Sequence, residues 1–211
     1  MKAVILAGGT AEATDDLKRA CQSASLVVAA DSGLRHAAAL ELSPDIIVGD
    51  FDSVPNDVLA LYPDLPRLEH PPEKDLLDLE LALDYAESVG ATECLIVGGL
   101  GSRFDQSLAA VLIATRRKAQ GLTVSLRSGH QAVYILAGRD ALVLERPPKQ
   151  RFSLLSLVET SVVSLENAKY PLGRSPLPFG VGLGVSNEVA RSPLGVTLHD
   201  GLVALVLEGL L

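Results

Sequence analysis

The sequence of 211 residues contains no tryptophan and only two cysteines, Cys21 and Cys94. Each cysteine stands alone in an apolar stretch, so the pair suits neither a disulfide framework nor a zinc site. No segment approaches the roughly 18 consecutive apolar residues of a membrane-spanning helix. The first residues also lack the basic region, long apolar run and cleavage site of a signal peptide. We therefore expect a cytoplasmic protein with reduced thiols and no membrane partner.

Positive charge is also scarce. The chain has 18 Lys and Arg against 26 Asp and Glu, which gives a formal net charge of -8. Binding to a nucleic acid backbone requires a basic face, so the balance argues against nucleic acid as a partner. A small phosphorylated ligand remains compatible with this charge if a metal ion supplies positive charge. The content of 48% hydrophobic and 21% charged residues is that of a globular protein, long enough for one large domain or two small ones.

The first half of the chain alternates continuously apolar runs with amphipathic ones. Strands are expected at residues 2–6, 26–30, 45–48, 93–97 and 123–126. Helices are expected at about 15–22, in a short segment ending at 40, at 75–89 and at 104–120. Strands that are apolar throughout are buried on both faces, as in a parallel sheet covered by helices. We predict an N-terminal α/β domain, residues 1–128, with a mostly parallel sheet.

The pattern changes near residue 129. Short β-like runs follow at 133–136, 141–144, 152–157, 161–165, 195–199 and 202–207, with turn sequences between them. No convincing helix is expected there, and residues 170–184 read as a long loop rich in proline and glycine. We predict an all-β, β-sandwich-like domain over residues 129–211.

Acidic and glycine-rich segments follow three of the predicted strands. Asp31-Ser32-Gly33 follows the second strand, 49–53 (Gly-Asp-Phe-Asp-Ser) follows the third, and 98–106 (Gly-Gly-Leu-Gly-Ser-Arg-Phe-Asp-Gln) follows the fourth. The start of the helix at 75–89 adds further acids. The carboxyl ends of parallel strands lie at one edge of a sheet, where ligands bind, so these segments should converge.

The spacing of the acids favours a magnesium site. Asp50 and Asp52 would point to the same side of an extended segment, and Asp75 and Asp78 would share a helix face. Clustered carboxylates repel one another and repel phosphate. Mg²⁺ removes both problems because it bridges carboxylates to substrate phosphates.

Each of these signals has a simpler explanation when taken alone. Asp75 is more readily explained as a helix N-cap, and Gly49-Asp50 equally well as a turn. The glycines at 98, 99 and 101 would let backbone N–H groups approach an anion, with Arg103 beside them, but they match neither a P-loop nor a dinucleotide fingerprint. The four histidines show no metal spacing and no nucleophile partner. The functional interpretation therefore depends on all of these segments meeting at one edge of the sheet.

Taken together, these segments resemble the thiamine pyrophosphokinase family. The resemblance is carried by 30–33, Pro44-Asp45, 49–53, Lys74-Asp75 with Asp78, and 98–106, and in the second domain by 170–172 (Tyr-Pro-Leu) and 184–188 (Gly-Val-Ser-Asn-Glu). It spans nearly the whole chain. Its most specific parts are Gly-Asp-Phe-Asp-Ser and Gly-Gly-x-Gly-x-Arg-Phe-Asp-Gln. Leu77 departs from the family, which often has threonine there.

The resemblance implies an enzyme that transfers the pyrophosphoryl group of ATP to the hydroxyl of thiamine, giving thiamine diphosphate and AMP, with Mg²⁺ as cofactor. It implies a homodimer in which thiamine lies between the α/β domain of one subunit and the β domain of the other. By position, it assigns Mg²⁺ to Asp50, Asp52, Asp75 and Asp78; ATP to Asp31, Ser32, Gly33, Gly98, Gly99, Gly101, Arg103 and Gln106; catalysis to Asp78, Asp105, Arg103 and Lys74; and thiamine to Ser186 and Asn187. The proton acceptor is left open between Asp78 and Asp105.

Two other functions remain as alternatives. The opening 2–9 (Lys-Ala-Val-Ile-Leu-Ala-Gly-Gly) resembles that of sugar-phosphate nucleotidyltransferases, but Glu12 follows where that family has a basic residue. A non-catalytic nucleotide or metal sensor is the second alternative. Thiamine-dependent release of AMP from ATP would distinguish the kinase from both.

Overall fold

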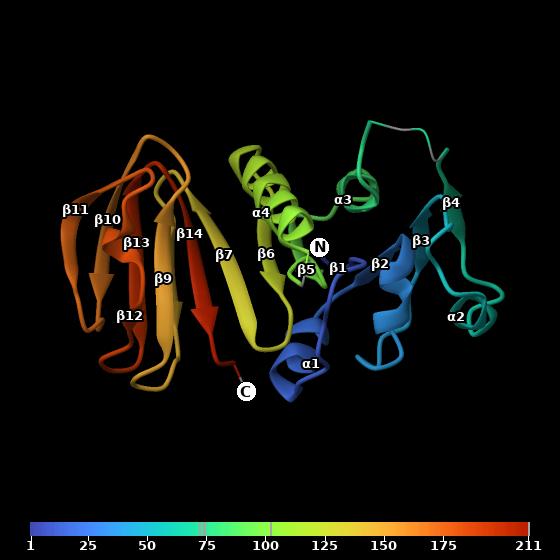
Figure 1. The fold of residues 1–211 in the computed structure, drawn as a ribbon, viewed down its shortest axis with the longest axis horizontal. Helices are drawn as coiled ribbons and strands as arrows, with labels where there is room; N and C mark the ends of the chain where they lie inside the picture. The colour runs from blue at the N-terminus through green and yellow to red at the C-terminus, as the bar shows by residue number, and fades with distance from the viewer. Residues whose placement is uncertain (72, 74, 102, 211) are drawn as a thin grey trace. The chain divides into compact units, whose positions relative to one another are not determined.

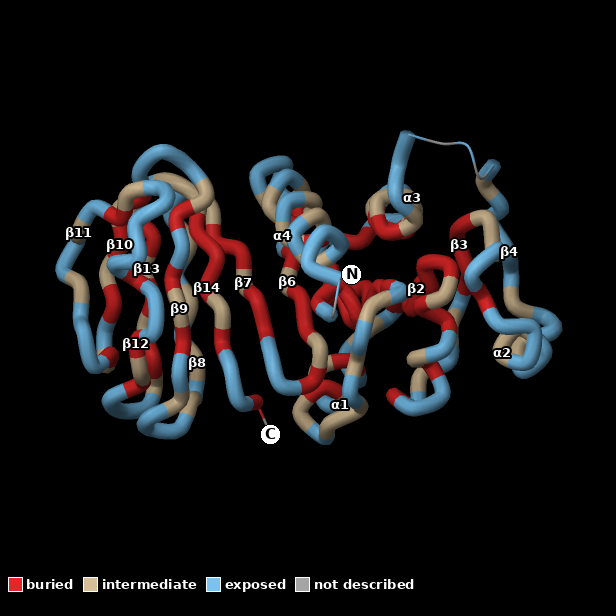
Figure 2. Tube along the Cα trace, in the orientation of Figure 1, coloured by how far each residue is buried: buried red, intermediate tan, exposed pale blue. Residues whose placement is uncertain are grey.

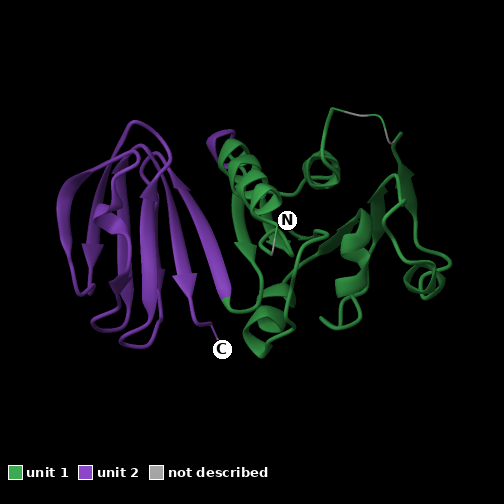
Figure 3. Ribbon diagram, viewed as in Figure 1, with its two compact units in different colours: residues 1–117, 121–130, 211 green, residues 118–120, 131–210 purple. Residues whose placement is uncertain are grey.

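The computed structural model describes residues 1–71, 73, 75–101 and 103–210 (Figure 1). These residues form two compact units (Figure 3). Unit 1 contains residues 1–117 and 121–130, and unit 2 contains residues 118–120 and 131–210. The predicted fold class, α/β followed by all-β, is confirmed.

Unit 1 is built on a sheet in which all strand pairs are parallel, in the order β6-β5-β1-β2-β3-β4. The strands are β1 (Lys2–Leu6), β2 (Leu26–Ala30), β3 (Ile46–Gly49), β4 (Arg67–Glu69), β5 (Glu93–Val97) and β6 (Thr123–Arg127). The chain runs outward from β1 through β2, β3 and β4, then returns to the other side of β1 for β5 and β6. This reversal of direction beside β1 creates the kind of crevice in which open α/β sheets bind ligands.

Helices cover both faces of this sheet. They are α1 (Asp15–Cys21), the 3-10 helix η1 (Asp31–His36), α2 (Asn56–Ala60), α3 (Asp78–Ser88) and α4 (Phe104–Ala119). Leu17 and Cys21 of α1 pack with Leu6 and Val27 on one face. Helix α3 contacts β1, β2 and β3, and Figure 1 shows α3 and α4 on the face opposite α1. Burial on both faces explains why the central strands are apolar throughout (Figure 2).

The start of α3 differs from the prediction. The helix begins at Asp78, and the N–H of Leu77 donates to Oε2 of Glu80 at 3.2 Å. Leu77 has extended backbone angles, so Asp75 lies before the helix. It is therefore neither the N-cap nor on a helix face shared with Asp78, and both of those predictions were wrong.

Unit 2 contains two antiparallel sheets. The first has neighbouring strands β12-β9-β14-β7: Asn187–Glu188, Arg151–Ser156, Leu202–Glu208 and Gln131–Ala137. The second has the order β11-β10-β13-β8: Leu172–Pro178, Thr160–Glu166, Leu194–Asp200 and Ala141–Leu144. Alternate residues of both sheets form one apolar core that includes Phe152, Leu154, Val163 and Leu198.

Strand β11 corrects the prediction of a long loop at 170–184. Its Pro176 and Pro178 register against β10, and β11 is the outer strand of its sheet. An edge strand uses only half of its N–H groups in the sheet, so proline is tolerated there. Short elements were also missed in unit 1, namely α2 and the exposed β4. No helix among the described residues combines the length and apolarity needed to cross a bilayer.

Candidate active site

A pocket of about 360 Å³ opens at the carboxyl edge of the unit 1 sheet. The segments that follow β1, β2 and β5 line it, together with the first turns of α3 and α4. Among the predicted site residues, its walls include Asp31, Ser32, Asp78, Gly98, Gly99, Gly101, Arg103 and Gln106. The predicted convergence of separate segments at this edge is therefore present in the fold.

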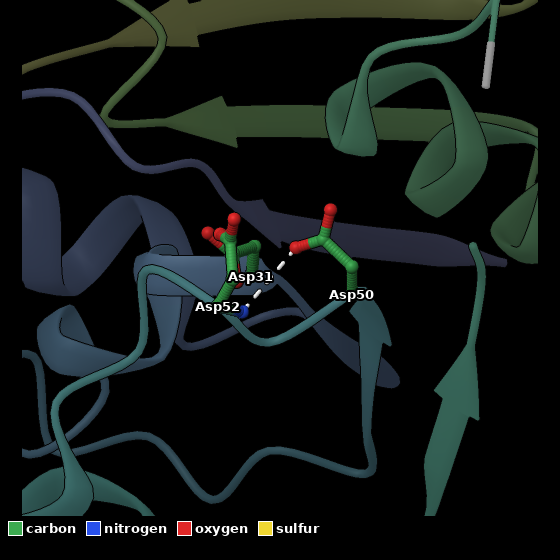
Figure 4. A group of neighbouring side chains, drawn as sticks. All are labelled: Asp31, Asp50 and Asp52. Carbon is green, nitrogen blue, oxygen red and sulfur yellow. Dashed lines mark hydrogen bonds between the residues drawn. The ribbon is translucent and has the colours of Figure 1, made fainter. Parts of the chain in front are cut away.

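Three carboxylates beside the pocket form an acidic group, defined as Asp31, Asp50 and Asp52 (Figure 4). One carboxylate oxygen from each lies within 4.8 Å of the others. Asp31 comes from the start of η1, and the other two follow β3. The family resemblance assigned Asp31 to ATP rather than to the metal, and the fold places it with Asp50 and Asp52, which the resemblance assigned to the metal.

The segment that carries Asp50 and Asp52 is a turn, not the expected extended chain. Phe51 has φ +65, and the N–H of Asp52 donates back to Oδ1 of Asp50 at 3.3 Å. This bond folds the segment tightly, because an aspartate side chain can cap the amide two residues later. The two carboxylates approach each other through the turn rather than through strand alternation.

Asp78 reaches the same place from the first residue of α3. A Cβ atom built on Gly49 would lie 3.1 Å from Oδ1 of Asp78 and 3.1 Å from Cβ of Asp31. Gly49 also has φ +145, which other residues rarely adopt. The absence of a side chain at Gly49 thus leaves room for both aspartates beside the end of β3.

The electrostatics of Asp31 indicate a site built for a cation. Burial raises the pKa of its carboxyl, and the neighbouring charges of Asp78, Asp50 and Asp52 raise it further, against a hydrogen bond from the amide of Ser32. Its Oδ1 is buried and accepts no hydrogen bond from any described residue. Asp31 also has φ +46, an uncommon conformation for a residue with a side chain. Hard oxygen donors crowded in this way fit Mg²⁺, which would relieve their repulsion.

The glycine loop, residues 98–101, forms another part of the pocket wall. Gly98 has φ +75, and a Cβ there would lie 2.4 Å from the carbonyl oxygen of Ala7. The amide of Gly9 donates to the carbonyl of Gly98 at 2.8 Å, so the loops after β1 and β5 lie in contact. The amide of Gly101 donates to Oγ of Ser107 at 3.0 Å, which ties the loop to α4.

Arg103 and Asp105 flank the start of α4 as an exposed pair. Nε and Nη2 of Arg103 donate to the two oxygens of Asp105 at 3.2 and 2.6 Å. The hydrogen bonds lower the pKa of Asp105 and raise that of Arg103. Arg103 lines the pocket, whereas Asp105 does not.

Other predicted residues stand apart from the pocket. Gly33 is buried under β1, where a Cβ would lie 1.9 Å from the carbonyl oxygen of Leu6, so it serves close packing. Asp75 is exposed and belongs neither to the acidic group nor to the pocket wall. Lys74 lies outside the described residues.

Two neighbouring residues of η1 were not predicted: Arg35, which lines the pocket, and His36, which does not. Nη2 of Arg35 donates to the carbonyls of Gly8 and Gly9, the latter at 2.8 Å. Nε2 of His36 lies 2.9 Å from the same Gly9 carbonyl. A carbonyl oxygen only accepts, so Nε2 is the donor of this bond, and burial lowers the pKa of the His36 ring. In the sequence, their position shortly after Asp31-Ser32-Gly33 could have indicated that they belong to the same part of the site.

The predicted thiamine residues lie in unit 2. Ser186 is exposed, has φ +58, and donates its amide to Oγ of Ser153 at 3.2 Å. Asn187 is buried, and its amide group bonds both backbone polar groups of Tyr170, at 3.1 and 2.9 Å. Asn187 thereby joins the segment at Tyr170 to the segment that carries Ser186.

Comparison with known proteins agrees with this geometry in both units. Residues 17–126 match the family description "Thiamin pyrophosphokinase, catalytic domain", and residues 142–203 match "Thiamin pyrophosphokinase, vitamin B1 binding domain". The thiamine pyrophosphokinase of Bacillus subtilis (strain 168) is 24% identical over 205 residues, with 96% of each chain covered.

Solved structures share the fold over the full length. The crystal structure of thiamine pyrophosphokinase from Bacillus subtilis superposes with a TM-score of 0.86 at 24% identity, covering 100% of both chains. That of thiamin pyrophosphokinase from Geobacillus thermodenitrificans gives 0.83 at 24% identity, covering 99% of this chain and 98% of the other. With its catalytic and vitamin B1 binding domains both matched, the chain belongs to the thiamin pyrophosphokinase family.

Proposed function

We propose that this chain performs the reaction of its family at the carboxyl edge of unit 1, with ATP in the pocket and Mg²⁺ on the acidic group and Asp78. Thiamine pyrophosphokinase activity transfers the pyrophosphoryl group of ATP to the hydroxyl of thiamine and releases AMP. The observation that carries the site assignment is the meeting of four carboxylates from three separate segments beside a glycine-lined pocket.

The ion would be held by Asp31, Asp50, Asp52 and Asp78. When bound, Mg²⁺ neutralises phosphate charge and supplies Lewis-acid assistance to the transfer. Asp75 was an expected ligand, but it is exposed, lies before α3 and belongs neither to the acidic group nor to the pocket wall, so we assign it no part in holding the ion. The remaining catalysis is positioning and charge neutralisation, as in other phosphoryl transfers.

The glycine loop and the first turn of α4 are proposed to hold the nucleotide. Gly98, Gly99 and Gly101 leave the wall free of side chains, so a ligand can approach the backbone closely. Gln106 adds an amide, and Arg103 adds a guanidinium that can pair with phosphate oxygens. Lys74 is proposed as a further phosphate cation, on the family likeness alone.

Asp78 is proposed as the proton acceptor for the thiamine hydroxyl. Asp105 was the other candidate, but both of its oxygens accept hydrogen bonds from Arg103 and it does not line the pocket. Asp105 instead positions Arg103. The pocket location of Asp78 supports the assignment.

Unit 2 is proposed to bind thiamine, with Ser186 in contact and Asn187 positioning the contact loop. The nearby segment exposes Phe179, Val181, Leu183 and Val185, an apolar surface suited to an aromatic ring or to a second subunit. We propose a homodimer on the same grounds, together with the family likeness.

The test is an assay of AMP release with purified chain, ATP, Mg²⁺ and thiamine. We expect AMP release that requires both thiamine and Mg²⁺, and its near-complete loss in Asp50→Asn with retained folding. Asp64→Asn, an exposed aspartate outside the pocket and the acidic group, is the matched control. Full activity of Asp50→Asn would refute the metal assignment.

A further inference from the structure

Arg35 is a pocket residue whose positive charge is not neutralised by a carboxylate among the described residues. It lines the pocket from η1, and its Nη2 atom bonds the carbonyls of Gly8 and Gly9. Those partners are neutral, and no carboxylate among the described residues pairs with the Arg35 guanidinium. Arg103, the other described cation of the pocket wall, is instead compensated by Asp105.

The geometry also leaves donors available. A guanidinium has five N–H groups in a planar fork, and bonds from Nη2 to two carbonyls leave those on Nη1 and Nε. Holding Nη2 on the Gly8–Gly9 backbone limits the rotation of the fork. A guanidinium fixed in this way can present paired donors to an anion at little further entropic cost.

The same contacts link Arg35 to the glycine loop of the pocket. The carbonyl of Gly9 accepts from Arg35 and His36, while the amide of Gly9 donates to the carbonyl of Gly98 at 2.8 Å. Gly98 begins the glycine loop. Arg35 therefore sits at the end of a continuous set of hydrogen bonds that joins the loops after β1, β2 and β5.

We propose that Arg35 binds the polyphosphate chain of the nucleotide with its Nη1 and Nε groups while its Nη2 group holds the Gly8–Gly9 loop. The proposal rests on the pocket being the ATP site. It gives the pocket a phosphate-binding cation on the β1–β2 side, in addition to Arg103 at the start of α4. It also predicts that the contribution of Arg35 grows with the number of phosphates on the ligand.

The experiment measures dissociation constants of adenosine, AMP, ADP and ATP, with Mg²⁺, for the full chain and for Arg35→Gln, Arg35→Lys and Arg116→Gln. Arg116 is exposed on α4 and does not line the pocket, so Arg116→Gln removes the same charge elsewhere. We expect Arg35→Gln to weaken ATP binding about 10- to 100-fold, the range for hydrogen bonds to a charged group. Adenosine affinity should stay near that of the wild type.

The ATP affinity of Arg35→Lys should lie between those of the wild type and Arg35→Gln, because an ammonium keeps the charge and loses the paired donors. It also keeps the test decisive if Arg35→Gln proves unstable. Equal weakening of adenosine and ATP, or unchanged ATP affinity, in the folded variants would overturn the proposal and leave Arg35 as a loop clamp at most. If the wild type binds ATP no more tightly than adenosine, the chain does not recognise the polyphosphate and the proposed function itself fails, which distinguishes that failure from a failure of the Arg35 proposal.

Discussion

Replacing Asp31 with asparagine should stabilise the metal-free protein while removing its activity. Asp31 is only 7% exposed, and its carboxylate lies within 4.8 Å of those of Asp50 and Asp52. Coulomb's law at that separation gives about 3.5 kcal/mol per pair at a dielectric constant of about 20, and about 0.9 kcal/mol at about 80. Because Asp52 is exposed and Asp50 half-buried, the lower figure applies, about 2 kcal/mol for both pairs.

Part of that gain is offset. The amide of Ser32 bonds the Asp31 carboxylate, and a neutral acceptor weakens this bond by about 1 kcal/mol. Asparagine tolerates the left-handed backbone of this position, so no strain is added. The net gain of about 1 kcal/mol corresponds to a rise in Tm of about 2–4 °C for a chain of this size.

The assay is thermal unfolding of wild type, Asp31→Asn and Asp64→Asn in EDTA, and again with Mg²⁺ and ATP. We expect Asp31→Asn to melt highest in EDTA, to gain least from Mg²⁺ and ATP, and to release no AMP. A lower Tm than wild type in EDTA would refute the argument from repulsion. Undiminished turnover would refute the metal role of Asp31.

Three further predictions concern single residues. Gly33→Ala should lower the free energy of unfolding by about 3 kcal/mol, because its Cβ would overlap a backbone carbonyl; urea denaturation measures this, and an unchanged midpoint would contradict it. Burial lowers the pKa of His36 in the folded protein, so below about pH 6.5 the unfolded chain binds more protons at this residue than the folded chain does. The contribution of His36 to the free energy of unfolding should therefore be full above about pH 6.5 and be lost as the pH falls through the folded-state pKa. His36→Gln should lose less stability than wild type between about pH 7 and pH 5, and equal losses would exclude His36 as the cause. Asn187→Ala should raise the KM for thiamine about tenfold, because it removes the two hydrogen bonds that hold the segment at Tyr170, and it should leave the KM for ATP unchanged. A change in the KM for ATP alone would contradict the assignment of this loop to the thiamine site.

Most of the fold was accessible from the sequence because burial imposes simple patterns. Strands covered on both faces are apolar throughout, and β1, β2 and β5 begin and end where the pattern predicts. Edge elements escaped prediction because they bury little. The exposed β4 carries no apolar signal, and the prolines of β11 indicate a loop until its position at the sheet edge is known.

For the site, the sequence determined which segments carry chemistry, since acids and glycines directly after apolar strands must collect at one sheet edge. Only the tertiary structure decided which of them meet. Asp31 joins Asp50 and Asp52 because a left-handed turn at Phe51 folds one segment toward η1, while Asp75 falls outside because α3 begins three residues later. Such distances depend on backbone turns and on contacts between strands that are remote along the chain, and spacing in the sequence does not encode them.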